Sequence, residues 1–169
     1  ILERFKIPYT HSGVIASSIA MDKEVSKKIF IKNKIKTPKF FTFSYNISKL
    51  DLIKKIKREL KFPVVVKPLN EGSSVNVYIS DMINLNKILY KLKSYKKVII
   101  EQFIPGREIQ VAIMGDRKLG AIELKPKRKF YDYHAKYSSK AKTKHIIPVD
   151  LNKKDYKKLM SITLKAHKL

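Results

Sequence analysis

The sequence predicts an α+β fold built from mixed or antiparallel sheets with flanking helices. Two fully apolar runs, residues 64–66 and 98–100, have the composition of buried strands. Apolar residues recur at helical spacing in residues 52–60 and 85–92, which predicts amphipathic helices. A Gly-Asp pair at 115–116 separates two extended segments and predicts an antiparallel hairpin. With 169 residues, 44% of them hydrophobic, the chain can form one domain or two small lobes.

The remaining elements follow from local spacing and from helix-breaking residues. In chain order, the predicted elements are the end of a helix at 1–6, a strand or turn at 7–9, a helix at 22–33, a strand at 40–43, a helix at 52–60, strands at 64–66 and 75–79, a helix at 85–92, strands at 98–100, 108–114 and 118–124, and a helix at 153–169. Met21, Val25 and Ile29 are expected on the apolar face of the second helix. The last helix has no strand after it and is expected to lack a packing partner.

The net charge of +24 invites a nucleic-acid interpretation. However, only five of the 38 basic residues are arginine, the side chain whose planar fork best recognises bases and phosphates. The lysines are also spread through every segment, as compositional drift would place them. We therefore expect no specific nucleic-acid partner, and a basic chain that binds nucleic acid non-specifically is kept as an alternative.

Other composition features exclude several classes of protein. There is no cysteine, so disulfides and cysteine-based metal sites are excluded. No apolar run approaches the ~18 residues of a membrane span, and the first ten residues lack a signal-peptide core. We expect a cytoplasmic protein that does not bind a membrane.

The first segment that indicates chemistry joins a buried strand to a Gly-Ser loop. Lys67 stands at the end of the apolar strand, and the loop that follows contains Gly72, Ser73 and Ser74. Glycine permits close approach, free N–H groups form an anion nest, and the lysine supplies a compact positive charge. This combination favours phosphate binding over a surface loop that happens to follow a lysine.

A second segment runs from the apolar strand at 98–100 into a turn. Exposed backbone between Glu101 and Ile104 has the donors and acceptors to pair with an adenine edge, and Phe103 or Ile104 supplies apolar contact. Glu108, beyond the turn, can accept hydrogen bonds from ribose hydroxyls. An edge strand followed by a hairpin explains the same pattern equally well.

These two segments, in this order, resemble the ATP-grasp family, and within it the D-alanine–D-alanine ligases. The matching motifs are Pro8-Tyr9-Thr10 with Ser12-Gly13-Val14 and Ala16-Ser17, Met21-Asp22-Lys23, Lys67, Glu71-Gly72-Ser73-Ser74-Val75, Glu101-Gln102-Phe103, Gly106-Arg107-Glu108, and Phe130-Tyr131-Asp132-Tyr133 with Ala135-Lys136-Tyr137. Lysine anchors and a Gly-Ser loop are shared by many ATP-grasp enzymes, whereas the last block is much narrower.

The resemblance implies a role for each matching residue. The implied ATP-binding residues are Lys23, Lys67, Glu71, Ser73, Ser74, Glu101, Gln102, Ile104, Glu108, Phe130 and Lys136, and the implied catalytic residues are Ser73, Lys136 and Tyr137. Lys23 and Lys67 would contact the phosphates from opposite sides. Lys136, on a mobile lid at 130–148, would reach the terminal phosphate. Such a lid suits an acyl-phosphate intermediate, which must be shielded from water.

The implied activity is the ATP-dependent joining of two D-alanines for peptidoglycan synthesis. The carboxylate of one D-alanine attacks the γ-phosphate, and the amine of the second then displaces phosphate from the acyl phosphate. Mg²⁺ or Mn²⁺ is expected as cofactor, with no metal ligand in this chain and the ligands beyond Leu169. The full-length enzyme is expected to be a homodimer, and this chain alone is expected to be too short to catalyse.

The resemblance also implies a division of the chain. Residues 1–20 would end an N-terminal substrate domain, 21–105 would form the central ATP-grasp lobe with the phosphate loop, and 106–169 would begin the C-terminal lobe with the lid. The sequence departs from the family's usual residues at His11, Asn76, His134, His145 and Asp150. Its four histidines lack metal-ligand spacing. Another ATP-grasp ligase, such as a D-alanine–D-lactate ligase, is the nearest enzyme alternative, because most of the second-substrate pocket is expected outside the chain.

Overall fold

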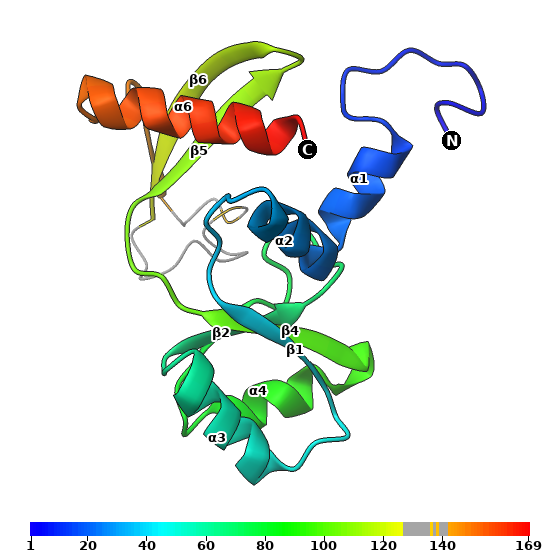
Figure 1. Cartoon of the computed structure of the whole chain (residues 1–169), viewed down its shortest axis with the longest axis vertical. Coiled ribbons are helices and arrows are strands. Elements are labelled where there is room, and N and C mark those ends of the chain that lie inside the picture. Colours follow the sequence, from blue (N-terminus) through cyan, green and yellow to red (C-terminus); the bar gives the residue numbers. More distant parts are fainter. Residues whose placement is uncertain (127–135, 137, 139–141) are drawn as a thin grey trace.

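The computed structural model describes all of the chain except residues 127–135, 137 and 139–141. The helices are α1 (Val14–Met21), α2 (Lys23–Lys32), α3 (Lys49–Glu59), α4 (Leu85–Lys91), the short 3-10 helix η1 (Lys93–Tyr95) and α6 (Lys153–His167). The strands are β1 (Phe40–Ser44), β2 (Val64–Pro68), β3 (Tyr78–Ser80), β4 (Lys97–Gln102), β5 (Glu108–Met114), β6 (Arg117–Lys125) and β7 (Lys144–Ile146). The strands form two antiparallel sheets, which Figure 1 shows one above the other.

The first sheet has the strand order β1-β4-β2-β3 and holds the main hydrophobic core. Helices α3 and α4 cover one of its faces, and α2 lies on the other side (Figure 1). Along β4, Val98 and Ile100 belong to the core under α3 and α4, while the alternate residues Ile99 and Glu101 point to the opposite face. This alternation places a carboxylate on the face that does not carry the core.

Local sequence accounts for the two covering helices. Ser48 caps α3, because its hydroxyl accepts a hydrogen bond from the backbone N–H of Asp51 at 3.2 Å. Leu52 and Ile56 then fall on one face and are fully buried. In α4, Leu85, Ile88 and Leu89 are buried by the same spacing.

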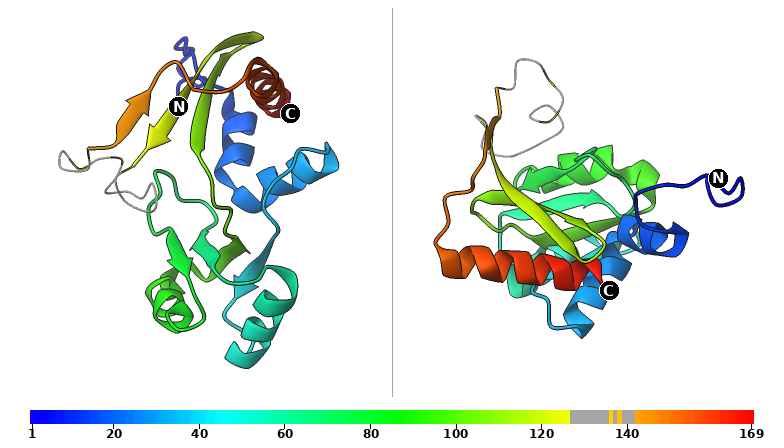
Figure 2. Two further views of the ribbon diagram at one scale, coloured as in Figure 1. Left: turned by 90° about the vertical axis from the view of Figure 1, so that its left-hand side faces the viewer. Right: turned by 90° about the horizontal axis from the view of Figure 1, so that it is seen from above.

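The second sheet, β5-β6-β7, carries α6 across β5 and β6 (Figure 2). Gly115 turns the β5–β6 hairpin with a φ of 56°, a conformation that glycine adopts without strain. Asn152 caps α6 by accepting from the backbone N–H of Asp155 at 2.9 Å. Met160 is the buried residue of this helix.

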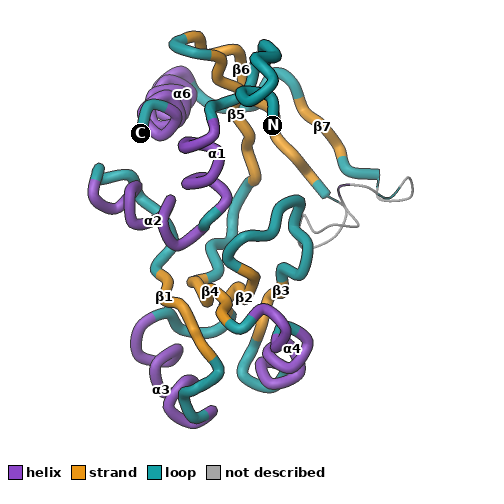
Figure 3. Tube along the Cα trace, turned by 90° about the vertical axis from the view of Figure 1, so that its right-hand side faces the viewer, coloured by secondary structure: helices purple, strands orange, loops and turns teal. Residues whose placement is uncertain are grey.

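The two sheets lie at opposite ends of the molecule, with α1 and α2 between them (Figure 3). Asp22 ends α1 and caps α2, where its Oδ1 accepts from the N–H groups of Glu24 and Val25 at 2.9 and 3.0 Å. The Lys23 N–H donates to the Leu69 oxygen at 3.2 Å, which holds the start of α2 beside the loop that follows β2. Among the described residues, no helix is both long enough and apolar enough to cross a membrane.

Most predicted elements are confirmed, but four details were wrong, and helix α1 and strand β7 were not predicted. Residues 2–6 form turns rather than the end of a helix, and residues 7–9 are irregular backbone rather than the expected strand or turn. The predicted strand 75–79 is shorter, because Val75 and Asn76 belong to the loop before β3. The apolar face expected on α2 was also wrong: Met21 ends α1 and is 52% exposed, Val25 on α2 is 40% exposed, and the buried residue of α2 is Lys27.

The fourth correction concerns the C-terminal helix. It was expected to lack a packing partner, but α6 packs against β5 and β6, two strands that precede it in the chain. A strand was also missed: β7 lies within the segment 130–148 that was predicted to be a lid, and it pairs with the end of β6. Neither contact is local in sequence, so spacing along the chain does not indicate it.

Candidate functional site

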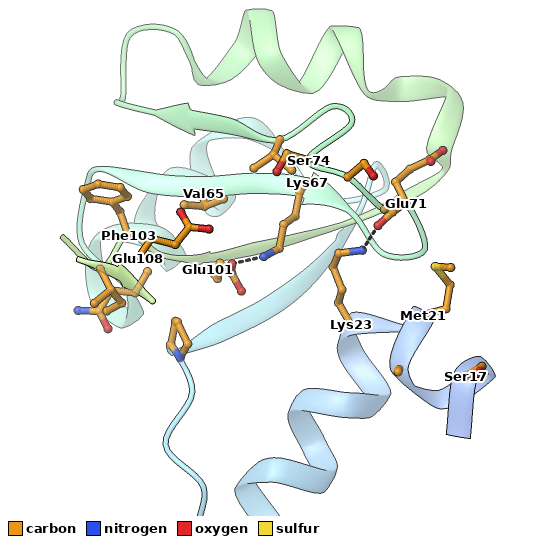
Figure 4. Close-up of a pocket in the computed structure, with 17 residues that line it drawn as sticks. Ser17, Met21, Lys23, Val65, Lys67, Glu71, Ser74, Glu101, Phe103 and Glu108 are labelled. Carbon is orange, nitrogen blue, oxygen red and sulfur yellow. Dashed lines mark hydrogen bonds and ion pairs between the residues drawn. The ribbon is translucent and has the colours of Figure 1, made fainter. Parts of the chain in front are cut away.

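A cavity of about 890 Å³ opens where the β2–β3 loop, the α1–α2 junction and the link between β4 and β5 meet (Figure 4). It brings together nine of the residues predicted to bind ATP, which are Lys23, Lys67, Glu71, Ser73, Ser74, Glu101, Gln102, Ile104 and Glu108. These residues come from segments up to 85 positions apart in the sequence (108 − 23). Two segments that the sequence suggested separately therefore form one site.

Lys67 and Glu101 lie in the floor of this cavity, on neighbouring strands. The Lys67 ammonium donates a hydrogen bond to Oε1 of Glu101. The other oxygen, Oε2, pairs with the Lys27 ammonium at 2.9 Å. The Glu101 side chain is about nine-tenths buried, so its charge depends on these two cations rather than on water.

Lys23 approaches the cavity from the first turn of α2. Its ammonium donates to the backbone oxygens of Leu69, at 3.0 Å, and Glu71, both in the loop after β2. Burial, followed by the positive charge of nearby Lys67, lowers the pKa of Lys23 from its usual range. The two lysines thus direct positive charge into the cavity from two elements, as expected for groups that hold a polyphosphate.

The Gly-Ser loop lies over this pair of cations. Ser73 and Ser74 have φ angles of 49° and 59°, and the loop is closed by the Val75 N–H donating to the Gly72 oxygen at 2.9 Å. Two successive residues with positive φ bend the backbone sharply, and both of them line the cavity. The loop therefore borders the cavity with two hydroxyl-bearing residues, which is where the phosphate interpretation expects them.

Asn76, one of the departures from the family pattern, connects this loop to the first sheet. Its side-chain amide donates to Tyr95 Oη at 2.7 Å, and Tyr95 Oη donates to Glu71 Oε1 at 3.1 Å. Tyr78 Oη also donates to Asn76 Oδ1 at 3.2 Å. Asn76 has a φ of 55°, where glycine would be unstrained, and these hydrogen bonds explain how asparagine serves there.

The other side of the cavity is the link from β4 to β5. The Gln102 N–H is used inside the protein, because it donates to the Lys39 oxygen at 2.9 Å, while Phe103 and Ile104 line the cavity beside it. Burial raises the pKa of the Glu108 carboxyl, and the charge of Lys136 opposes this. Phe103 and Ile104 can give apolar contact to a base, and Glu108, in the same cavity, can accept hydrogen bonds from ribose hydroxyls.

Sequence reasoning missed part of the lining. The cavity also contacts Gly72 and Phe103, which the motifs had indicated, and six residues that they had not, which are Ser17, Ala20, Met21, Pro38, Val65 and Val77. Of these, Val65 had a usable signal, because residues two apart on a strand share a face and Lys67 was already assigned to the site. The α1 residues had no such signal, since that helix was not predicted.

The predicted catalytic residues are only partly placed. Ser73 lines the cavity, and Lys136 acts electrostatically on Glu108. Tyr137 and Phe130 lie outside the described residues. Among the residues that are described, no group of three or more His, Cys, Asp or Glu side chains could hold a metal ion.

The geometry can be compared with known proteins. A family model described as the D-ala D-ala ligase C-terminus matches residues 29–169. The chain belongs to the D-alanine–D-alanine ligase family. Its fold is the ATP-grasp fold of that family, an α+β arrangement with antiparallel sheets and flanking helices.

Individual members of the D-alanine–D-alanine ligase family resemble the whole chain. The D-alanine–D-alanine ligase of Pelagibacter ubique (strain HTCC1062) is 68% identical over 169 residues, which is all of this chain and 56% of the relative. The ligase of Wolbachia pipientis wMel is 41% identical over 99% of this chain and 52% of its own length. The chain spans about half the length of the curated relatives it matches.

Solved structures agree with the sequence comparison. The crystal structure of a D-alanine–D-alanine ligase from Bacillus anthracis superimposes with a TM-score of 0.80 at 33% identity, covering 99% of this chain and 54% of that one. The same enzyme complexed with ATP gives a TM-score of 0.75 at 27% identity, covering 99% and 52%. The likeness therefore extends over nearly the whole chain.

Proposed function

We propose that this chain is the ATP-binding part of a ligase that forms D-alanyl-D-alanine from two D-alanines through an acyl phosphate. The observation that carries the proposal is that one cavity is lined by Lys23, Lys67 and the Gly-Ser loop, by the apolar residues Phe103 and Ile104, and by Glu108. Family membership supports the same activity. The product dipeptide would serve peptidoglycan synthesis.

ATP fits the cavity in both size and charge. A volume of about 890 Å³ lies within the range of pockets that enclose small ligands. We assign the phosphates to Lys23, Lys67, Ser73 and Ser74, the adenine to the segment 101–104, and the ribose to Glu108. Positive charge that is already in place stabilises the negative charge developing on the transferred phosphoryl oxygens.

Several parts of the proposal extend beyond the cavity. We propose that Lys136 reaches the terminal phosphate and that Ser73 joins Tyr137 in a hydrogen-bond link. Mg²⁺ or Mn²⁺ would neutralise phosphate charge, with ligands outside this chain. We also propose a cytoplasmic homodimer as the complete enzyme, with the chain divided into 1–20, 21–105 and 106–169 as the sequence suggested.

The test is nucleotide binding to the chain, measured by isothermal titration calorimetry. Lys67→Met should weaken ATP binding by about tenfold or more, since it removes a charge-assisted hydrogen bond to phosphate. Lys54→Met is the matched control, because Lys54 is exposed on α3, beyond the opposite face of the sheet. Absence of ATP binding, or equal affinities of the two variants, would overturn the proposal.

Substrate identity is tested in the full-length enzyme by following phosphate release. Release that requires D-alanine, with the dipeptide as product, supports the proposal. Release that requires D-lactate as the second substrate would instead identify a D-alanine–D-lactate ligase. Binding to RNA that falls steeply with salt, without ATP binding, would identify the basic chain as a non-specific nucleic-acid binder.

A further inference from the structure

A buried lysine lies directly behind the floor of the cavity. Lys27, on α2, is only 8% exposed, and its ammonium pairs with Glu101 Oε2 at 2.9 Å. The same ammonium donates to Thr37 Oγ1 at 2.7 Å and lies 4.9 Å from the centre of the Phe40 ring. Lys27 is not among the residues that line the cavity, so it lies behind Glu101 as seen from a ligand there.

The two cations that pair with Glu101 differ in their access to the cavity. One carboxylate faces two ammonium groups, Lys27 from α2 and Lys67 from β2, each on a different oxygen. Lys67 borders the cavity, whereas Lys27 is enclosed between α2 and the sheet. Only one of the two cations is therefore positioned to leave Glu101 for a ligand.

This difference in access between Lys27 and Lys67 matters when a phosphate enters the cavity. An incoming phosphate attracts the Lys67 ammonium, and a buried carboxylate that loses its only counter-ion is strongly disfavoured. With Lys27 still in place, Glu101 remains paired after Lys67 turns away. Among the residues that the structure describes, Lys23 makes no hydrogen bond or ion pair with Glu101, because its ammonium donates to the Leu69 and Glu71 oxygens.

We propose that Lys27 is a positioning residue, the fixed counter-ion of Glu101 that allows Lys67 to exchange the carboxylate for nucleotide phosphate. The proposal rests on ATP binding in this cavity. Lys27 then affects phosphate binding without touching the ligand. Any effect that it has through the adenine segment 101–104 is common to ATP and adenosine, so it cancels in the ratio of their affinities. A lysine that merely holds α2 against the sheet would affect both kinds of ligand alike.

The experiment compares ATP with adenosine as ligands of the 169-residue chain, using competition against a fluorescent nucleotide. Lys27→Met should lower the ratio of ATP affinity to adenosine affinity by about tenfold, because the loss falls on the phosphate-binding part of the ligand. Lys27→Arg keeps the charge and should restore most of the ratio between the two affinities. Lys32→Met, at the exposed end of the same helix, should leave both affinities unchanged.

A double variant separates the pairing from the packing. Lys27→Met combined with Glu101→Gln removes the buried carboxylate charge along with its counter-ion, so the ratio of ATP to adenosine affinity should return to that of Glu101→Gln alone. If Lys27→Met lowers both affinities equally, or neither, the proposal is wrong. If the unsubstituted chain binds no ATP, the proposed function itself fails, which is a different result.

Folding of the variants is checked by circular dichroism. Should Lys27→Met fail to fold, the test moves to the Glu101→Gln background, where Lys27 has no carboxylate to hold. There, removal of the Lys27 charge should leave the ratio unchanged, and a fall of about tenfold would overturn the proposal.

Discussion

The two sheets differ in how their residues are held in place. In the first sheet, β4 and β2 are almost fully buried, and twelve side chains form one continuous core with α3 and α4. Around the second sheet, the apolar side chains buried among the described residues are Leu124, Val149 and Met160. Its strand β5 alternates between half-buried and exposed residues. The first sheet is therefore stabilised by a packed apolar core, whereas the second sheet has few buried apolar side chains.

Polar contacts compensate in the second sheet. Arg107 donates to both carboxylate oxygens of Glu123, at 2.8 and 2.6 Å, and to the Asp150 oxygen at 2.8 Å. Lys168, at the end of α6, pairs with Asp116 in the hairpin turn. The cavity thus has a floor supplied by the packed sheet and a wall, Glu108, supplied by the sheet held through polar contacts.

The largest expected effect is on the free energy of unfolding, when one isoleucine in each sheet is truncated to alanine. Ile100→Ala in β4 should lower the free energy of unfolding by about 4 kcal/mol, because it leaves a cavity in a close-packed core. Ile109→Ala in β5 should cost about 1 kcal/mol, because that side chain is already half-exposed. Urea denaturation measures both values, and equal losses would contradict the contrast between the sheets.

The strands of the first sheet were easier to predict from sequence than those of the second, because burial in the apolar core also determines their composition. Residues 64–66 and 98–100 are apolar because both faces of their strands are buried, so composition reveals them. Strand β7 has no such composition, and α6 packs on strands that precede it, so neither contact could be predicted from spacing.

The candidate site shows the same division. Lys67, Ser73 and Glu108 were indicated by motifs, because a ligand requires those chemical groups in a set order. Lys27 was not, because its function as a counter-ion depends on a strand 74 residues away (101 − 27), and among 33 lysines (38 − 5) it has no distinguishing neighbour.

A smaller effect is expected at the polar contact that supports the second sheet. Arg107→Lys removes the two-pronged pairing with Glu123 and the bond to Asp150, so amide hydrogens of β6 and β7 should exchange several-fold faster. The first sheet should not change. Arg117→Lys, an exposed position at the start of β6, is the control. Hydrogen exchange measured by mass spectrometry checks this. Equal exchange rates of β6 and β7 in the Arg107→Lys and Arg117→Lys variants would contradict the prediction.

The same contact should respond to pH. The hydrogen bond from Arg107 lowers the pKa of Glu123, so the pairing stabilises the folded state above the ordinary glutamate pKa and loses that effect as pH falls through the lowered value. Arg107→Lys weakens the pairing, so faster exchange in the second sheet should begin at a higher pH than in the unsubstituted chain. Onset at the same pH in both would show that Glu123 depends on other groups.

The smallest effect is expected in the loop that covers the packed floor. Tyr95→Phe removes the hydroxyl that joins Asn76 to Glu71, and should weaken ATP binding about threefold while lowering the free energy of unfolding by no more than about 1 kcal/mol. Tyr90→Phe, at a side chain that is 79% exposed, controls for loss of a hydroxyl. Calorimetric titration with ATP measures the first effect. If affinity is unchanged, the Gly-Ser loop owes its shape to its own backbone, and the packed sheet fixes only the floor of the cavity.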